Sequence, residues 1–247
     1  MKKLFALLLA MAMVFALAAC GNTEPTTAPT TAPTTAPTDP TDPAVTVMTY
    51  EEFVAAEIDA DVVVECYVQD HQSWWDNKIT VYAQDENGGY YLYEMACSEE
   101  DSARLVPGTK IRVTGVKAEW AGEIEIVDAT FEILEGSWVA EAQDVTELLG
   151  TEELESKMNQ LGAFKGLTVV SWAYQNETVG KDIYLTVSYN GNEYDFCVES
   201  YLTADGSEVY DLAETLVAGQ IVDIEGFIYW YEGANPHITS ITVVEVG

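Results

Sequence analysis

Basic residues are scarce in this chain of 247 residues. Its 10 lysines and arginines stand against 42 aspartates and glutamates, which gives a formal net charge of −32 at pH 7. Such a surface repels phosphate backbones and anionic lipid head groups, and nucleic-acid affinity depends mainly on cations. The composition therefore argues against nucleic acid as a partner, unless a local patch of cations escapes the average. The scattered acidic residues favour solubility outside the cell.

Groups used in catalysis and metal binding are also few. The chain has two histidines, His71 and His237, and no Cys-x-x-Cys or His-x-x-x-His spacing indicates a zinc site. With 42 acidic residues, carboxylate pairs arise by chance, so none predicts a glycosidase dyad. The acidic loops lack the spacing of an EF-hand. We therefore expect no enzyme, no cofactor and no metal site.

Cysteine is limited to four residues, of which Cys20 stands apart near the N-terminus. The others, Cys66, Cys97 and Cys197, each lie in an apolar, strand-like run, and an odd number cannot all pair within one chain. We favour buried thiols that pack as small hydrophobic side chains. A disulfide between Cys66 and Cys97 stays open, because sequence alone does not decide pairing.

The first 19 residues predict a secretory leader. Lys2 and Lys3 precede an apolar run over residues 4–19, which is too short for a comfortable membrane span and ends in small residues. The sequence Leu-Ala-Ala-Cys at 17–20, followed by Gly21, resembles the bacterial lipobox. The resemblance implies cleavage after residue 19 and a diacylglyceryl group on Cys20, which would anchor the protein at the outer face of the bacterial cytoplasmic membrane, on the cell surface. The alternative is an ordinary secreted protein.

We expect residues 20–47 to form the lipid-modified cysteine and a tether rich in threonine and proline. Thr-Thr-Ala-Pro recurs over residues 26–37, and Thr-Asp-Pro follows twice. Proline favours extended polyproline II, so the segment is a semi-rigid spacer that reaches up to roughly 80 Å at about 3.1 Å per residue. It resembles the stalks of Gram-positive surface lipoproteins, especially clostridial ones.

Beyond the tether the chain repeats itself. Residues 106–115 match residues 217–226, and Trp-Ala-Gly at 120–122 matches Tyr-Glu-Gly at 231–233 with the same offset. We interpret this as two copies of one domain, at 48–135 and 160–247. Residues 136–159 join them as a helical linker, with a helix expected over 144–160 whose apolar stripe is Val145, Leu148, Leu149 and Leu154.

Both copies predict the same order of elements. In the first copy, Thr49 and Glu52 form a capping box that begins a short helix. Alternation and turn signals then predict strands at 62–69, 78–83 and 90–95, a helix at 98–105, and strands at 110–114 and 123–133. The second copy predicts strands at 167–174, 182–189 and 193–198, a helix within 205–217, and strands at 221–228 and 237–245.

Three strands, a helix and two strands is the order of the OB-fold. The chain resembles that family beyond the tether, and residues 107–115 resemble the fourth strand of OB domains in bacterial surface lipoproteins; the second copy has Ala218 in place of Pro107. We expect a mainly β protein with two tandem five-stranded OB-fold-like barrels, each with a short helix between its third and fourth strands. An SH3-like barrel or a β-sandwich is the alternative, against which the helix argues.

Aromatic residues are the strongest candidates for a binding site. The OB resemblance implies binding across the second and third strands, between the loops after the first and fourth, and rings gather in those places in both copies. Adjacent tryptophans in the loop after the first strand cannot both point into a core. For any single ring, plugging a barrel end is the alternative. The candidate ligand-binding residues are Trp74, Trp75, Tyr91, Tyr93, Trp120, Tyr184, Trp230 and Tyr231.

These observations favour a membrane-anchored, non-enzymatic binding module for an oligosaccharide or an envelope protein, engaged through the aromatics of the first copy. An alternative is single-stranded nucleic-acid binding by base stacking. A third is a spacer or assembly protein whose aromatics are buried between the copies. Nucleic-acid binding would require four cations gathered on one face: Lys78, Lys110, Arg112 and Lys117.

Overall fold

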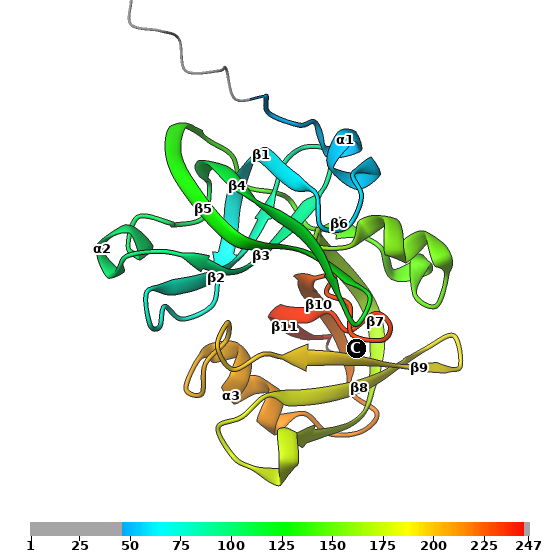
Figure 1. Ribbon diagram of the computed structural model, residues 1–247. Helices are drawn as coiled ribbons and strands as arrows, with labels where there is room; N and C mark the ends of the chain where they lie inside the picture. The colour runs from blue at the N-terminus through cyan, green and yellow to red at the C-terminus, as the bar shows by residue number, and fades with distance from the viewer. Residues whose placement is uncertain (1–45, 245–247) are drawn as a thin grey trace, which may run out of the picture. The chain divides into compact units, whose positions relative to one another are not determined.

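The first five long strands close into a barrel in the order β1-β2-β3-β5-β4. This computed structural model describes residues 46–244 (Figure 1), so the expected leader, Cys20 and the tether up to residue 45 lie outside the described residues. The elements are α1 (Tyr50–Ala55), β1 (Asp61–His71), β2 (Lys78–Gln84), β3 (Gly89–Ala96), α2 (Glu99–Ser102), β4 (Thr109–Trp120) and β5 (Glu123–Ser137). β3 and β5 pair in parallel, and the other neighbours are antiparallel.

Strict alternation in β1 produces the interior of this barrel. Val62, Val64, Cys66 and Val68 are all buried in one hydrophobic core, as the period of two predicts. The expected capping box is present, because the Thr49 hydroxyl accepts from the Glu52 backbone N–H and the Glu52 carboxylate accepts from the Thr49 backbone N–H. These features confirm the predicted capping box and the predicted first strand.

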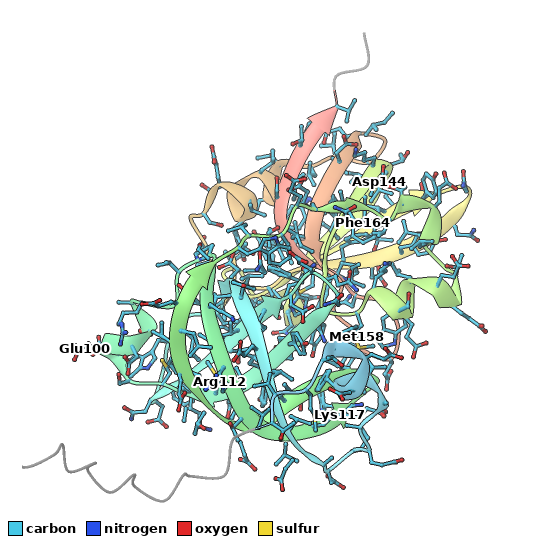
Figure 2. All side chains as sticks on the ribbon, turned by 90° about the horizontal axis from the view of Figure 1, so that it is seen from above. Glu100, Arg112, Lys117, Asp144, Met158 and Phe164 are labelled. Carbon is cyan, nitrogen blue, oxygen red and sulfur yellow. The ribbon has the colours of Figure 1, made fainter. Side chains whose placement is uncertain are left out.

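Lys117 of β4 ties α1 to the barrel. Its side chain is only 5% exposed, and its ammonium donates to the carbonyl oxygens of Phe53, Val54 and Ala56 at 3.1, 2.9 and 2.7 Å. Figure 2 shows Lys117 beside the blue helix. A cation at the carboxyl end of a helix satisfies carbonyl groups that have no partner within the helix. This lysine is therefore committed to the fold.

The second half of the chain repeats the strand order of the first. Its sheet has the order β10-β11-β9-β8-β7-β6, and β10 also pairs with β7. The second half therefore has the strand order β7-β8-β9-β11-β10, which corresponds to β1-β2-β3-β5-β4 in the first half. The short strand β6 is an addition beside β7. The elements are β6 (Gln143–Asp144), β7 (Leu161–Tyr174), β8 (Ile183–Tyr189), β9 (Asn192–Val198), α3 (Glu208–Thr215), β10 (Ile221–Phe227) and β11 (His237–Val244).

The prediction of a continuous helix over 144–160 is wrong. The structure has β6, then two 3₁₀-helices at Thr146–Leu148 and Glu152–Lys157. Gly150, with a φ of 75°, separates the two helices, and Asn159 turns the chain into β7 with a φ of 64°. Three of the four residues of the predicted stripe, Val145, Leu149 and Leu154, are buried in the core of the second half, with Leu148 packed against it. Burial was predicted correctly from the apolar spacing, but the breaks were not.

The three cysteines that the structure describes, Cys66, Cys97 and Cys197, are free and buried. The favoured prediction of buried thiols is confirmed, and burial raises the pKa of the Cys97 thiol to about 11. Among the described residues, no helix is long and apolar enough to cross a membrane.

Candidate functional site

Four aromatic rings join the two halves of the chain. Tyr82 and Tyr91 are cross-strand partners on the outer face of β2 and β3, and they pack with Phe227 and Tyr229 from the second half. The Tyr82 and Phe227 rings stack with centroids 4.5 Å apart, and the Tyr91 and Tyr229 centroids are 5.2 Å apart. Much of the face by which the first barrel was expected to bind a ligand is therefore covered by the second half.

This placement corrects the expected role of Tyr91. The sequence does not show whether Tyr91 or its neighbour faces outward; the structure directs Leu92 into the barrel and Tyr91 outward, where the second half buries it. Tyr93, two residues further along β3, stays exposed. Tyr91 stabilises the contact between the two halves, so little of it is accessible to a ligand.

Trp74 and Trp75 have different roles. The Trp74 indole N–H donates to the Cys97 carbonyl oxygen at 2.9 Å, and the half-buried ring packs against the core of the first barrel. Trp75 is 65% exposed and lines a cavity of about 450 Å³ with Tyr93 and Tyr201, which we call the Trp75 patch. The expectation that one of the pair leaves the core is met by Trp75, whereas Trp74 is a structural residue.

The equivalent face of the second half is open. Along β8 and β9, Ile183, Leu185, Val187, Phe196 and Val198 point into the core. The alternate residues point outward as cross-strand pairs, Tyr184 with Cys197 and Thr186 with Asp195. These four side chains line a cavity of about 990 Å³, which we call the junction cleft. Its position on the second and third strands of the repeat is the one that the OB-fold uses for oligonucleotides and oligosaccharides.

Two loops that correspond in the repeat meet at this cleft. Trp120 ends β4 of the first barrel, and Tyr231 follows β10 of the second half; their ring centroids are 5.2 Å apart. The Glu232 backbone N–H donates to the Ala121 carbonyl oxygen at 2.7 Å, which fixes one loop against the other. Trp120 is 54% exposed, Tyr231 51% and Tyr184 40%, so three candidate rings are accessible in one place.

Trp230, the last candidate aromatic, packs beneath these loops. It is half-buried against the core of the second half. A Cβ on Gly122 would stand 2.8 Å from Cδ1 of its ring, so glycine makes room for the indole. The structure thus brings Trp120, Tyr184 and Tyr231 together and leaves Trp230 as a packing residue.

A buried histidine lies at the floor of the cleft. His237 is 6% exposed, and its Nδ1 is 2.6 Å from the Tyr82 hydroxyl, while its ring stacks on Tyr229 with centroids 4.1 Å apart. Burial lowers the pKa of His237 to about 3, so the ring is neutral at physiological pH. No hydrogen bond of the described residues uses its Nε2, which leaves one polar ring atom for a ligand.

The cleft carries acidic groups without basic ones. Carboxylates of Asp182, Glu193, Asp195, Glu199 and Glu232 line it, and no lysine or arginine among the described residues does. Burial raises the pKa of Glu199 to about 7. The sequence identified the aromatic residues of the cleft as candidates, but its acidic residues were not predicted. The alternation of β8 and β9 could have identified Thr186 and Asp195, since it places them beside Tyr184.

Cations needed for nucleic-acid binding do not form a free face. Lys110 and Arg112, neighbours on one face of β4, both bind Glu65, at 2.7 and 2.8 Å. Lys78 binds Glu94 at 2.6 Å, and the fourth cation, Lys117, is buried under α1. The carboxylate of Glu65 lies between the two β4 cations, and its hydrogen bonds with them lower the pKa of that carboxyl. These ion pairs offset much of the positive charge of Lys110 and Arg112.

A second buried acid lies where β5, the linker and the loop after β10 meet. The Trp230 backbone N–H donates to Oε2 of Glu123 at 2.7 Å, and the Asn159 amide donates to the Ile124 carbonyl oxygen at 3.0 Å. Oε1 of Glu123 and Oδ1 of Asn159 are buried and have no partner among the described residues. Burial raises the pKa of Glu123 to about 8, so its carboxyl is mostly protonated at neutral pH.

No protein-family model matches the chain, and no curated protein matches it either. Several solved structures are similar at low identity. A murine DNA-binding protein bound to double-stranded DNA is 8% identical, over 75% of this chain and 96% of its own, with a TM-score of 0.36. A replication protein A heterotrimer bound to single-stranded DNA is 11% identical, over 74% of this chain and 48% of its own, with a TM-score of 0.29.

Asparaginyl-tRNA synthetase from Pyrococcus horikoshii is 21% identical over 36% of this chain, which spans 20% of the synthetase; the TM-score is 0.27. All three TM-scores lie below 0.5, so we derive nothing about ligand or activity from these likenesses. The barrel itself rests on the strand order described above.

Proposed function

We propose that the protein is an extracellular lipoprotein, anchored through Cys20, whose two tandem OB-like barrels bind a carbohydrate without catalysis. The ligand occupies the junction cleft. The observation that supports this most is the exposed pair of Trp120 and Tyr231 beside the open outer face of β8 and β9. Flat rings next to hydrogen-bonding groups suit the apolar and hydroxylated faces of a sugar.

Polar side chains in the cleft complement the rings. Gln72, Thr186, Asn235 and Asp195 line it and offer both donors and acceptors to hydroxyl groups. Its volume of about 990 Å³ lies at the upper end of the range for small-molecule sites and accommodates a short oligosaccharide. The second half of the chain therefore supplies most of the site, and the first half contributes Trp120 and Gln72.

A glycan array tests this proposal with the full-length chain, kept in solution by a detergent that contains no sugar. Trp120→Ala removes a ring from the cleft, and Trp75→Ala is its matched control, since both tryptophans are more than half exposed. We expect the wild type and Trp75→Ala to bind the same sugar and Trp120→Ala to lose it, with unchanged melting temperatures. Loss of the signal in Trp75→Ala alone would move the site to the Trp75 patch, and no sugar signal at all would contradict the proposal.

Single-stranded nucleic-acid binding is the second candidate. The barrel topology and the exposed rings of the Trp75 patch favour it, because bases stack on such rings in OB-folds. The ion-paired cations oppose it. Oligo(dT) and oligo(U), offered to the same protein at 50 and 200 mM salt, separate the two candidates. Binding that weakens steeply with salt and is lost in Trp75→Ala would favour nucleic acid.

Anchoring has its own test. Cys20→Ser removes the thiol that the lipobox resemblance assigns to the diacylglyceryl group. We expect the wild-type protein in the membrane fraction of the cells and the Cys20→Ser protein outside it. Equal fractionation of the two would contradict lipid anchoring at this residue.

A further inference from the structure

The charge of the junction cleft restricts the chemistry of its ligand. None of its five carboxylates (Asp182, Glu193, Asp195, Glu199 and Glu232) takes part in an ion pair among the described residues. A cleft lined by one sign of charge concentrates ligands of the opposite sign. An anionic sugar is therefore disfavoured, and a cationic ligand is favoured.

The hydrogen bonds to Asp195 and Asp182 come from uncharged donors. Oδ1 of Asp195 accepts from the Thr186 hydroxyl at 2.8 Å, and Oδ1 of Asp182 accepts from the backbone N–H and the hydroxyl of Ser200 at 2.9 and 2.7 Å. Hydroxyl and amide donors stabilise a carboxylate but do not neutralise it. The second oxygens of both aspartates have no hydrogen-bond partner among the described side chains and can accept from a ligand.

The donor set fits an organic cation better than a metal ion. No group of three or more histidine, cysteine or acidic side chains in the described residues is arranged to hold a metal. The exposed rings of Trp120 and Tyr231 offer instead the electron-rich faces that attract ammonium groups. Carboxylates beside aromatic faces are the combination that recognises an amine.

The buried histidine adds a group that points to a ligand independently of the acids. His237 is more than nine-tenths buried and lines the cleft, with Nδ1 bound to Tyr82 and Nε2 without a hydrogen bond among the described residues. As a neutral ring it presents one donor or acceptor, depending on the tautomer. A sugar hydroxyl satisfies either form.

We propose that the junction cleft selects sugars with a free amine, so that its ligand is an oligosaccharide of unacetylated amino sugars. The ammonium group pairs with Asp195 and the neighbouring acids, the ring stacks on Trp120 and Tyr231, and a hydroxyl meets His237. This inference rests on the proposed carbohydrate binding and adds the charge of the ligand to it.

Two tetrasaccharides test the inference, because they share a backbone and differ in the amine. The glucosamine tetramer carries ammonium groups at pH 6.5, and the N-acetylglucosamine tetramer carries none. Calorimetric titration of the full-length chain should give at least about tenfold tighter binding of the glucosamine tetramer, weakened by added salt. Asp195→Asn should remove most of that preference, because asparagine keeps an acceptor for Thr186 but has no charge.

Controls distinguish the cleft from the general acidity of the chain. Asp211→Asn removes an exposed acid on α3, outside the cleft, and should leave the preference intact. Trp120→Ala should weaken the binding of both tetramers. Equal affinity for the two sugars, or tighter binding of the acetylated one, would overturn the inference and leave carbohydrate binding standing. Binding of the glucosamine tetramer that survives Trp120→Ala would indicate nonspecific attraction and would also overturn it. Failure of both tetramers and of the glycan array would overturn the proposed function as well.

Discussion

Replacing Glu123 by glutamine should change how stability depends on pH. The wild-type carboxyl is fully buried, and its pKa is raised from 4.5 to about 8. Between these two values the folded protein holds a proton that the unfolded chain releases, so stability falls as pH rises from about 4.5 to about 8. Below pH 4.5 both states are protonated, and the effect vanishes.

The size of the effect follows from the pKa difference. Each pKa unit corresponds to about 1.4 kcal/mol, so the ionised carboxyl costs up to about 5 kcal/mol at pH 8.5. Glutamine has no charge to bury, keeps an oxygen for the Trp230 N–H, and offers an amide donor to the unpartnered Oδ1 of Asn159. Glu123→Gln should therefore be more stable than the wild type by a few kcal/mol at pH 8.5 and nearly equal at pH 4.5.

Urea unfolding followed by tryptophan fluorescence at pH 4.5, 6.5 and 8.5 measures this difference. The control is Glu135→Gln, which removes an exposed acid from the same strand and should follow the wild type at every pH. The reasoning is refuted if the free-energy difference between Glu123→Gln and the wild type is constant from pH 4.5 to 8.5, or if it favours the variant most at low pH.

Four further substitutions test the packing, each by urea unfolding. Trp74→Ala should cost about 3 kcal/mol of unfolding free energy through lost packing and a lost hydrogen bond, and Trp75→Ala under about 0.5 kcal/mol; equal effects would contradict their assigned roles. Gly89→Ala should cost about 1–3 kcal/mol, because its Cβ would stand 2.2 Å from the backbone of Asn159, and an unchanged midpoint would show that the linker yields freely. Lys117→Met should cost about 2 kcal/mol, because the α1 carbonyl groups lose a charged donor; a neutral result would mean that water replaces the ammonium.

Local sequence patterns predicted the strands because each pattern acts within a few residues. Alternation placed Val62 to Val68 in the core, and the capping box at Thr49, both helices after the third strand and most strands were found within a few residues of their observed bounds. The exceptions are β4, which continues to Trp120, and β7, which begins at Leu161, each well beyond the expected strand. The prediction for the linker failed because its apolar spacing fits a helix. The backbone at Gly150 and Asn159 instead takes positive φ values, which interrupt a helix.

The candidate site was predicted only in part, because it depends on contacts between residues far apart in the chain. Trp120 and Tyr231 were named from equivalent loops, but their stacking requires the two halves to pack together. The burial of Tyr91 has the same origin, since nothing near it in the sequence indicates that Tyr229 will cover it. Consequently the sequence pointed to the face of the first barrel, whereas the open face belongs to the second half.

Fluorine NMR of the full-length chain with 5-fluorotryptophan at its six tryptophans locates the ligand most directly. Trp120→Phe and Trp75→Phe assign the two signals that matter. On titration with the sugar that gives the strongest array signal, we predict that the Trp120 resonance shifts and the Trp75 resonance stays in place. A shift of Trp75 with Trp120 unmoved would contradict the junction cleft as the binding site.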